Sequence, residues 1–542
     1  MIRGTCGVSV AARPPLHFDR FPLDRAGDIR LDQAAMNAMI DSPDSLVVVF
    51  VDGKAVVGNV GASPSSVTVP VRTFSPDGKE LLDAEGDAVD MMPWVVSMDE
   101  FKQLAPKASD LGDIVFLGVH VGGEATSSRI STPPTPPTPP TPYTPVFAAS
   151  INVDDLEGEL EERGLRTVDA RRIGPKLTAE DASVLANASG MLSWHRNAKF
   201  DPRTGKETSD IVLGGHGRRV PGDTRVQYPR IDPAVIVSVE HGEWLLLGRK
   251  ASWEPGRYSL LAGFVELAES LEDAACREVF EESGVAVSRA SLTYHSSQPW
   301  PFPRSLMVGF SGTTADIERA PRGFDLLDSR EAQMAARGTG ILEDELDGLR
   351  AALTLPRVVV DEEEMQDVRW FHAGYLKRQL CDVGGVEGTE MRIPGKHAVA
   401  SSIIHDRLDR LTEGKNALEL VCPADLGPTN LPGIGNGGRR EMKYVLLRVA
   451  STTGGQYSSR FVVRGDPRAA YHNHVFTHAK TELRHFDLDV LGGGRIVVDE
   501  ERRRINVFGY SAAFGAAVHE ISRAVLLEQY PLYDIDVSYD GY

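Results

Sequence analysis

The chain has 542 residues, of which 42% are apolar, and this length corresponds to about three or four domains with cores of their own. No apolar run approaches the roughly 18 residues that cross a bilayer, and the glycine and proline contents are ordinary, so membrane-spanning and fibrous proteins are excluded. The formal net charge of −19 disfavours non-specific binding to polyanions. We therefore expect a soluble protein in which any phosphate chemistry uses a local site.

The first 190 residues predict a small mixed α and β domain. Strands are expected at 46–51, 55–57 and 114–119, and helices at 156–163 and 179–195. In this region residues 131–145 repeat Thr-Pro-Pro, which predicts a polyproline-II loop. Such a loop could bind an SH3-like partner, but a tolerated surface spacer is the commoner explanation.

A cluster of acids follows further along the chain. If residues 271–283 form a helix, Glu278, Glu281 and Glu282 stand at i, i+3 and i+4 on one face. Like charges at this spacing destabilise a helix, but they become favourable against a hard divalent cation such as Mg²⁺. A solvated glutamate-rich face is the alternative, and these three acids alone would favour it.

The spacing of the whole segment decides between the two interpretations. The segment has a glycine at Gly263, a glutamate at Glu269 and the run Arg-Glu-Val-x-Glu-Glu-x-Gly-Val from residue 277 to residue 285. This pattern resembles the box of the Nudix hydrolases, which binds metal and cleaves a diphosphate linked to another moiety. The resemblance implies that the three glutamates are catalytic metal ligands, with Mg²⁺ or Mn²⁺ as the cofactor.

A second motif narrows the substrate class. Residues 297–305 read Ser-Gln-Pro-Trp-Pro-Phe-Pro-Arg-Ser, which resembles the signature of the NADH diphosphatase subfamily. The prolines predict a rigid extended strand, on which Trp300 and Phe302 offer flat surfaces to a substrate with aromatic rings. An aromatic core strand is the alternative.

Four more positions carry over by this resemblance. Phe264 and Tyr228 match positions where the nucleobase stacks, and Ala400, which follows a Pro-Gly pair of the family's tail, is assigned to substrate binding. Glu364 matches a further metal-binding acid. A polar insertion near 314–357 precedes it.

The resemblance extends over about residues 18–410, with two departures, which are the insertion near 314–357 before Glu364 and the lack of a zinc ribbon. Related proteins carry a four-cysteine zinc ribbon where segments 200–205 and 218–223 of this chain have no cysteine. His195 and His216 alone cannot make a four-ligand site, so we predict no zinc. The cysteines lie far apart, which excludes a disulfide scaffold, and they are Cys6, Cys276, Cys381 and Cys422.

The last hundred residues predict a separate α+β domain. Prolines and glycines between Cys422 and Gly438 predict a linker without regular structure. Beyond it, short β-rich runs at 443–449, 459–463, 495–498 and 504–510 precede a helical pattern at 515–529. This segment carries six motifs, which are Met442-Lys-Tyr-Val-Leu-Leu-Arg-Val449, Val463-Arg-Gly465, Ala470-Tyr-His472, Leu491-Gly-Gly-Gly-Arg-Ile496, Val507-Phe-Gly-Tyr-Ser-Ala-Ala-Phe-Gly515 and Asp540-Gly-Tyr542. Their order and spacing resemble the Janus family, the protein phosphohistidine phosphatases.

The chemistry of a phosphoramidate indicates which residues of this segment act. It needs an anion cradle, a balancing cation, and a base or nucleophile near neutral pH. His472 is the only side chain in these motifs whose ordinary pKa suits the last role. Ser511, Ala512 and Ala513 can turn their backbone amides inward as an anion nest. The resemblance adds as substrate-binding residues Lys443, Arg495, Tyr471 and Asn473.

The sequence thus predicts an α+β multidomain chain. Its parts are an N-terminal NADH-diphosphatase-like domain (1–190), a cysteine-free ribbon region (191–230), a Nudix α/β/α sandwich (231–415), a linker (416–440) and a mixed-sheet phosphohistidine-phosphatase-like domain (441–542). The resemblance implies Mg²⁺-dependent cleavage of NADH or NAD to NMN(H) and AMP, and metal-independent hydrolysis of phosphohistidine in a protein or peptide. The alternatives are removal of NAD caps from RNA and a C-terminal domain that only binds phosphoproteins.

The sequence carries only weak signals of location and assembly. We expect a cytoplasmic protein without membrane contact, with a mitochondrion or a peroxisome-like organelle as the alternative. A homodimer through the Nudix half is a further expectation from the resemblance.

Overall fold

A computed structural model describes residues 165–315, 355–381, 391–413, 421–427, 438–453 and 456–539. It also describes shorter stretches between residues 23 and 162 and between residues 330 and 345. The chain separates into two compact units. The first comprises Met1–Ala234, Ser297–Val308 and His397–Val399, and the second comprises Val235–Ser296, Gly309–Lys396 and Ala400–Tyr542. No helix in the described ranges combines the length and the apolar character needed to cross a membrane.

The first unit is built on a mixed sheet in the order β3-β2-β1-β6-β5, with β4 paired to β1 and β7 to β2. Its strands are β1 (Leu46–Val51), β2 (Lys54–Asn59), β3 (Met91–Pro93), β4 (Val95–Ser97), β5 (Leu111–Val121), β6 (Tyr143–Ile151) and β7 (Leu165–Val168). Its helices are α2 (Gln33–Ile40), α3 (Met98–Leu104), α5 (Ala170–Ile173) and α6 (Ala179–Asn197).

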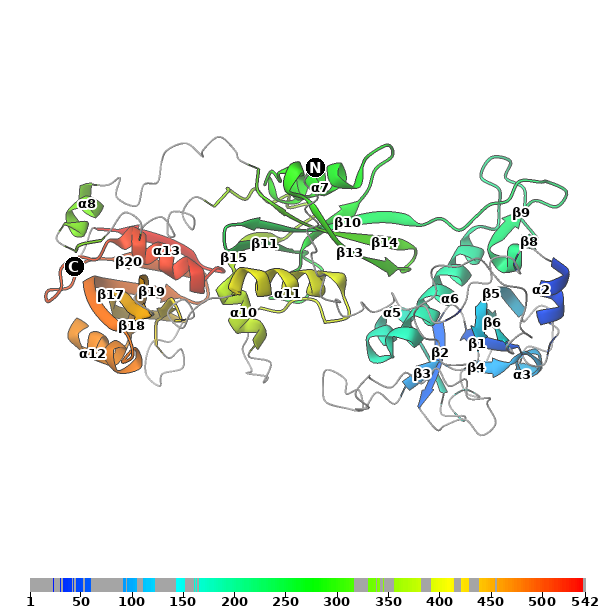
Figure 1. Cartoon of the computed structure of the whole chain (residues 1–542), viewed down its shortest axis with the longest axis horizontal. Coiled ribbons are helices and arrows are strands. Elements are labelled where there is room, and N and C mark those ends of the chain that lie inside the picture. Colours follow the sequence, from blue (N-terminus) through cyan, green and yellow to red (C-terminus); the bar gives the residue numbers. More distant parts are fainter. Residues whose placement is uncertain are drawn as a thin grey trace, which may run out of the picture. The chain divides into compact units, whose positions relative to one another are not determined.

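Side chains that alternate along β1 create the two cores of this unit. Val48 and Phe50 pack in a core with residues of α6, whereas Val47 and Val49 pack in a core with residues of α2 and α3. The sheet is therefore covered on both faces (Figure 1). The predicted strands and the helix at 179–195 are confirmed. Residues 131–142 of the predicted loop lie outside the described residues, as does most of the helix predicted at 156–163. The last three residues of that predicted loop are instead the start of β6, where Tyr143 to Pro145 pair with Val121 to Val119 of β5.

The ribbon region is held by hydrogen bonds. The carboxylate of Asp201 accepts the Thr204 backbone N–H at 2.8 Å, the Thr204 hydroxyl at 2.9 Å and the Gln227 amide at 3.2 Å. Buried Arg218 contacts Nδ1 of His195 at 3.0 Å. A short hairpin, β8 (Asp210–Val212) with β9 (Gly217–Arg219), completes the region.

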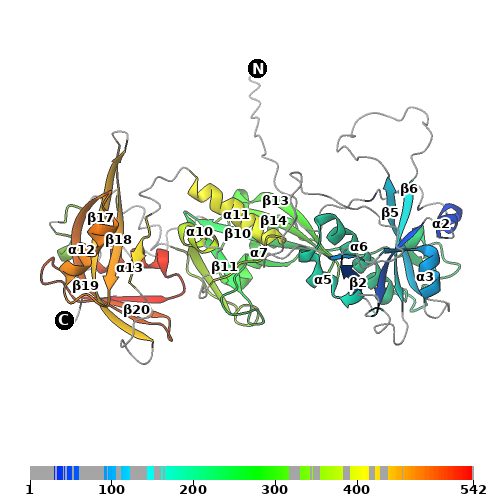
Figure 2. The same ribbon diagram turned by 90° about the horizontal axis from the view of Figure 1, so that it is seen from below.

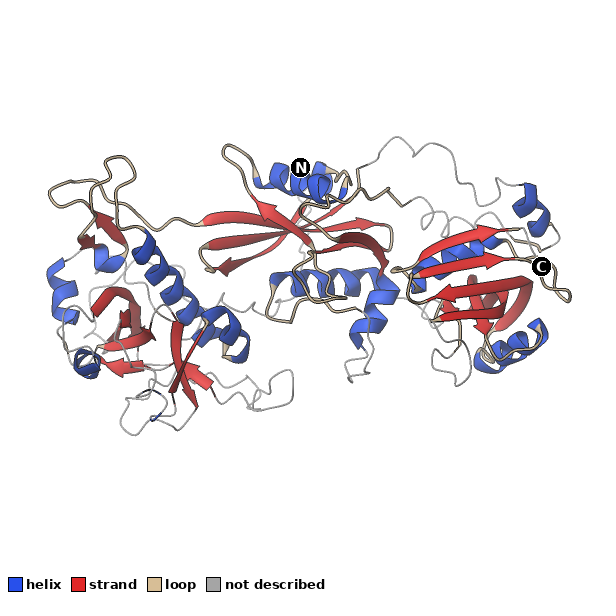
Figure 3. Ribbon diagram, turned by 180° about the vertical axis from the view of Figure 1, so that it is seen from behind, coloured by secondary structure: helices blue, strands red, loops and turns tan. Residues whose placement is uncertain are grey.

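A second sheet, in the order β13-β14-β10-β11-β15 with β12 on β10, carries the predicted acidic helix. Its strands are β10 (Asp232–His241), β11 (Trp244–Arg249), β12 (Leu261–Phe264), β13 (Thr293–Trp300), β14 (Ser305–Thr313) and β15 (Asp367–His372). Helix α7 (Leu271–Ser283) lies on one face and α11 (Val399–Thr412) on the other, and α10 (Ala373–Cys381) follows β15 (Figures 1 and 3). This arrangement confirms the predicted sandwich of helices around a sheet.

Local signals fix both ends of α7. The hydroxyl of Ser270 accepts the backbone N–H of Asp273 at 3.1 Å and caps the first turn. Gly284 ends the helix with φ of +69°, a left-handed conformation that glycine adopts without strain. The helix therefore spans the same residues that its sequence pattern predicts.

The C-terminal sheet has the order β16-β18-β17-β19-β20-β21. Its strands are β16 (Ala424–Asp425), β17 (Arg439–Thr453), β18 (Gln456–Asp466), β19 (Asp487–Asp499), β20 (Arg504–Phe508) and β21 (Asp534–Ser538). Val445 and Leu447 of β17 pack with Val475 of α12 (His472–Glu482), whereas Tyr444 bonds to His519 of α13 (His519–Gln529). The two helices therefore cover opposite faces of the sheet (Figure 2).

The structure corrects the predicted linker 416–440 at both ends, because at its second end β17 already begins at Arg439. Ala424 and Asp425 were expected to lack regular structure, yet they form β16 and pair in parallel with Val463 and Arg464 of β18. Residues 428–437 of the predicted linker lie outside the described residues. A fragment limited to the predicted domain 441–542 would lack this strand and the first two residues of β17.

Part of the insertion near 314–357 packs on the C-terminal sheet. Helix α8 (Arg330–Ala336) belongs to this insertion. Further along, the buried guanidinium of Arg448 in β17 donates to the Glu345 carboxylate at 2.9 Å and to the carbonyl of Gly340 at 2.7 Å. Ser459 of β18 donates to the same carboxylate at 2.5 Å.

Candidate active sites

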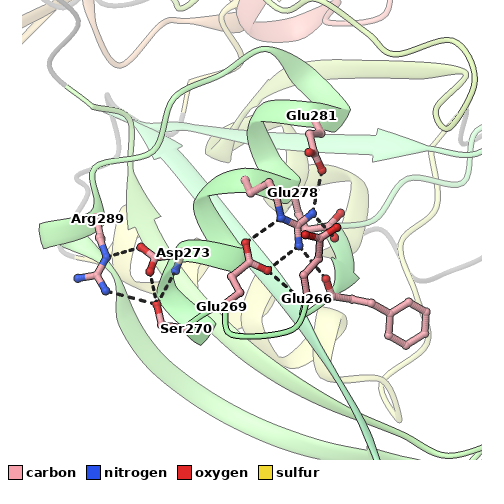
Figure 4. Close-up of polar contacts among 9 residues, drawn as sticks. Glu266, Glu269, Ser270, Asp273, Glu278, Glu281 and Arg289 are labelled. Atoms are coloured by element: carbon pink, nitrogen blue, oxygen red, sulfur yellow. Dashed lines mark hydrogen bonds and ion pairs between the residues drawn. The ribbon is translucent and has the colours of Figure 1, made fainter.

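One guanidinium organises the acidic face of α7. Arg277 donates Nε and Nη2 to the two oxygens of Glu269, each at 2.8 Å, and its Nη1 reaches Glu278 at 2.9 Å and Glu281 at 2.8 Å. A further bond from Nη2 ends on the carbonyl of Phe264 at 2.8 Å. Figure 4 shows the three carboxylates directed toward this single group. All five N–H donors of the guanidinium are engaged.

Glu282 lies deeper in the same site. Its side chain is 1% exposed, its Oε2 accepts the backbone N–H of Ala262 at 3.2 Å, and its Oε1 lies 3.7 Å from Nζ of Lys250. Burial raises the pKa of Glu282 to about 7 and also raises the pKa of Glu278, and the negative charge of Glu364 adds to both shifts. The predicted metal-binding acids are therefore close enough to repel one another.

This donor set fits a hard divalent cation. Buried, mutually repelling carboxylates are stabilised by such an ion, which prefers oxygen ligands. As the described side chains stand, no three acids, histidines or cysteines converge closely enough to hold a metal. Arg277 already pairs with Glu278 and Glu281, so these two carboxylates would have to turn partly away from it to share a cation.

The second site forms around the first residue of α12. His472 is largely buried, and its Nε2 donates to the carbonyl of Gly494 at 2.9 Å. A carbonyl only accepts, so the lone pair of the neutral imidazole lies on Nδ1. Lys443 and Arg495 face each other across β17 and β19. Burial lowers the pKa of His472, and these two cations lower it further.

The loop between Gly509 and Gly515 approaches the same histidine. A Cβ atom on Gly493 would lie 3.1 Å from the His472 ring and 3.2 Å from Cβ of Ser511, so these two residues border one glycine. The hydroxyl of Ser511 accepts the Ala513 amide at 3.3 Å, and Ala512 and Ala513 are exposed. The Ala513 amide therefore already has an acceptor within the loop.

Buried groups on the opposite face of the sheet hold this loop. Nδ1 of His519 contacts the Tyr444 hydroxyl at 2.6 Å, and its Nε2 donates to the carbonyl of Gly509 at 2.9 Å. Burial lowers the pKa of His519 to about 4, so the imidazole is neutral at physiological pH.

Three family models match regions of the chain. The NUDIX domain matches residues 229–336, the NADH pyrophosphatase-like rudimentary NUDIX domain matches 45–194, and the Janus/Ocnus family matches 430–534. The chain thus combines regions that match NUDIX domain models with a C-terminal region that matches the Janus/Ocnus family model. The resemblances identified in the sequence are thereby confirmed, whereas the boundaries drawn at 190, 230 and 415 stay predictions.

Curated relatives align with the NUDIX part. The chain is 36% identical over 203 residues to the NAD-capped RNA hydrolase NudC of Mycobacterium bovis, covering 36% of this chain and 64% of that protein. It is 43% identical over 241 residues to the NAD-capped RNA hydrolase NUDT12 of Homo sapiens, covering 42% of each chain. A NUDIX hydrolase structure from Nitrosomonas europaea matches 22% of this chain and 69% of that chain, with 24% identity and a TM-score of 0.20. The chain spans less than two thirds of the length of these curated relatives.

The predicted aromatic residues occupy different environments. Phe264 ends β12 in the NUDIX domain with 60% of its surface exposed, and Tyr228 is 63% exposed. Trp300 and Phe302 pack against the core that contains α6, and the Arg171 guanidinium lies 5.7 Å from the centre of a Trp300 ring. These contacts fit the alternative of an aromatic core strand, and substrate binding by this pair stays a prediction.

The remaining predicted residues lie as follows. Ala400 is buried near the start of α11 and Glu364 is exposed in the turn before β15. Tyr471 and Asn473, on either side of His472, are exposed. Lys250 is the residue of the NUDIX site that sequence reasoning missed, because it belongs to no motif and its only signal is its place directly after a buried strand.

Proposed function

We propose that the NUDIX half hydrolyses the diphosphate of NADH or NAD and releases NMN(H) and AMP. The observation that carries this proposal is the electrostatic repulsion among Glu278, Glu282 and Glu364, which a divalent cation held by these acids would relieve. The names of the curated relatives support a substrate that contains the NAD diphosphate.

The residues that would hold Mg²⁺ or Mn²⁺ are Glu278, Glu281, Glu282 and Glu364. Such an ion supplies activation of water and stabilisation of charge on the phosphate oxygens. The chain itself orients the carboxylates through Arg277 and offers the exposed ring of Phe264 to a nucleobase. Water adds to one phosphorus, the bond to the bridging oxygen breaks, and one proton of the water passes to a carboxylate.

A second substrate for the same site is RNA with an NAD cap, since the bond is identical. The names of both relatives, NAD-capped RNA hydrolases, support it, whereas the net charge of −19 disfavours tight contact with RNA beyond the cap. The full chain should be incubated with NADH, NAD, ADP-ribose and NAD-capped RNA, with and without Mg²⁺. We expect Mg²⁺-dependent AMP release from NADH. Cleavage of none of the four would overturn the proposal.

For the Janus/Ocnus domain we propose hydrolysis of phosphohistidine in a protein or peptide without metal. Nδ1 of His472 is available to take a proton from water or to attack phosphorus, beside the charges of Lys443 and Arg495. In the complete reaction the P–N bond breaks, the water oxygen joins phosphorus, and a proton passes to the leaving imidazole.

The alternative for this domain is binding of a phosphoprotein without turnover. A phosphohistidine peptide should be incubated with the full chain in EDTA, because β16 and Glu345, which lie outside the predicted domain 441–542, contact the C-terminal sheet. Phosphate release supports the phosphatase. Saturable binding with no release would replace it by the binding module.

A further inference from the structure

Lys250 lies on a fixed turn beside the NUDIX carboxylates. It follows β11 directly, and its carbonyl accepts the backbone N–H of Trp253 at 3.0 Å. Gly248 and Ser259 pair across the same hairpin through two backbone hydrogen bonds of 2.9 Å. The Lys250 side chain is 41% exposed, while its partner Glu282 is 1% exposed. The backbone is therefore fixed, and the ammonium stands where solvent meets the buried acids.

Two cations of the described structure border these acids, and they are held very differently. Arg277 uses every N–H of its guanidinium, so it has no donor left for a substrate. Lys250 makes one ion pair of 3.7 Å, which is longer than a hydrogen bond. An ammonium has three donors on a flexible four-carbon stem, so it can change partners at small cost.

A divalent cation held by these acids would compete with Lys250 for the carboxylate of Glu282. Oε2 of Glu282 is bonded to Ala262, which leaves Oε1 facing Lys250. A divalent cation among the acids would repel the ammonium from Oε1. A diphosphate brings negative oxygens to the same place, and lysine binds phosphate as a point charge.

We propose that the ammonium of Lys250 binds a phosphate oxygen of the dinucleotide substrate. This inference rests on the proposed function of the NUDIX half and adds a substrate-binding residue outside the box. Lys250 exchanges one ion pair for another without a change in covalent bonds. Its contribution is therefore to affinity for the diphosphate, while the acids of α7 contribute to the chemical step.

The test compares Lys250→Gln and Lys250→Arg in the full chain with Mg²⁺. Lys377→Gln is the matched control, because Lys377 is 40% exposed and pairs with Asp409 at 3.1 Å away from the site residues. Two quantities are measured: the kinetics of NADH cleavage, and calorimetric binding of an NAD analogue whose diphosphate has a methylene bridge. In Lys250→Gln we expect KM and Kd to rise about tenfold with kcat nearly unchanged. Lys250→Arg should recover part of the affinity, and the control should match the wild type.

The outcomes separate this inference from the proposed function. Unchanged KM and Kd in Lys250→Gln, with an active wild type, would overturn the role of Lys250 alone. Lys250→Gln could instead need less Mg²⁺ for half-saturation than the wild type while its affinity for the NAD analogue is unchanged. This result would also overturn the inference, since Lys250 would then only balance the charge of Glu282. A wild-type chain that neither cleaves NADH nor binds the analogue would overturn the proposed function and this inference with it.

Discussion

Gly263 lies against the carboxylate of Glu278, so close that a Cβ atom on the glycine would stand 1.9 Å from Oε2. No real side chain tolerates this approach, and Glu278 must move if residue 263 gains a methyl group. The glycine of the NUDIX box therefore makes room for a metal-binding acid.

Gly263→Ala should lower NADH hydrolysis at least about a hundredfold, because a displaced Glu278 no longer shares the cation. The fold should persist, since the Glu278 side chain can turn toward solvent. Steady-state rates and circular dichroism of the full chain check both statements. Gly242→Ala is the control: it adds strain at φ of +56° but meets nothing within 4 Å, so its rate should stay near wild type.

Glu282→Gln should abolish most activity, by about a hundredfold or more, because the buried carboxylate becomes a neutral amide of equal size. Folding should be unaffected, since burial already raises the pKa of Glu282 to about 7 and neutralising it removes repulsion. Glu281→Gln should also impair turnover, although the Glu281 side chain is 53% exposed. Wild-type rates in both variants, or in excess EDTA, would refute the metal-site assignment.

Elements whose ends are set by local sequence could be predicted, whereas contacts between distant segments could not. Helix α7 was predictable to the residue, because Ser270 and Gly284 mark its ends by local chemistry. The packing of Trp300 on α6 was not, since its partners lie more than 100 residues away in the chain. β16 was missed for the same reason: pairing with β18 outweighs the local signals of proline and glycine.

The ribbon region should contain no zinc, because Asp201 and Thr204 form a hydrogen-bonded turn in a segment without cysteine. Elemental analysis of the untagged protein should find less than one zinc per chain, and chelators should leave its thermal unfolding unchanged. Asp201→Ala should lower the temperature of thermal unfolding, since it removes the acceptor shared by Thr204 and Gln227. One zinc per chain, lost together with folding, would show that other ligands are used.

His519 should make the C-terminal domain less stable in mild acid. Its pKa is about 4 in the folded state and near 6.5 when unfolded, so below pH 6.5 the unfolded chain binds a proton that the folded one excludes. Stability is full above pH 6.5 and falls by up to about 1.4 kcal/mol per pH unit toward pH 4. Hydrogen exchange of the β17 amides, corrected for intrinsic rates, measures this slope. In His519→Gln the slope between pH 6.5 and 5 should be shallower, and an unchanged slope would contradict the assignment.

Nδ1 of His472 should be needed for phosphohistidine hydrolysis, either to take a proton from water or to attack phosphorus. His472→Ala should abolish phosphohistidine hydrolysis in EDTA and spare NADH cleavage, because Nδ1 of His472 is the proposed base or nucleophile. His474→Ala is the matched control on the same helix, since this exposed side chain should leave the rate unchanged.

Lys443→Ala should act on affinity instead, and it should mainly raise KM because the charge of Arg495 remains across the strand pair. Arg495 is itself bonded to Glu441 at 2.5 Å, so it should compensate only in part. Kinetics of the full chain with a phosphohistidine peptide separate the two effects. A fully active His472→Ala variant would exclude catalysis by His472. A wild-type chain that binds the peptide without releasing phosphate would assign this domain to recruitment.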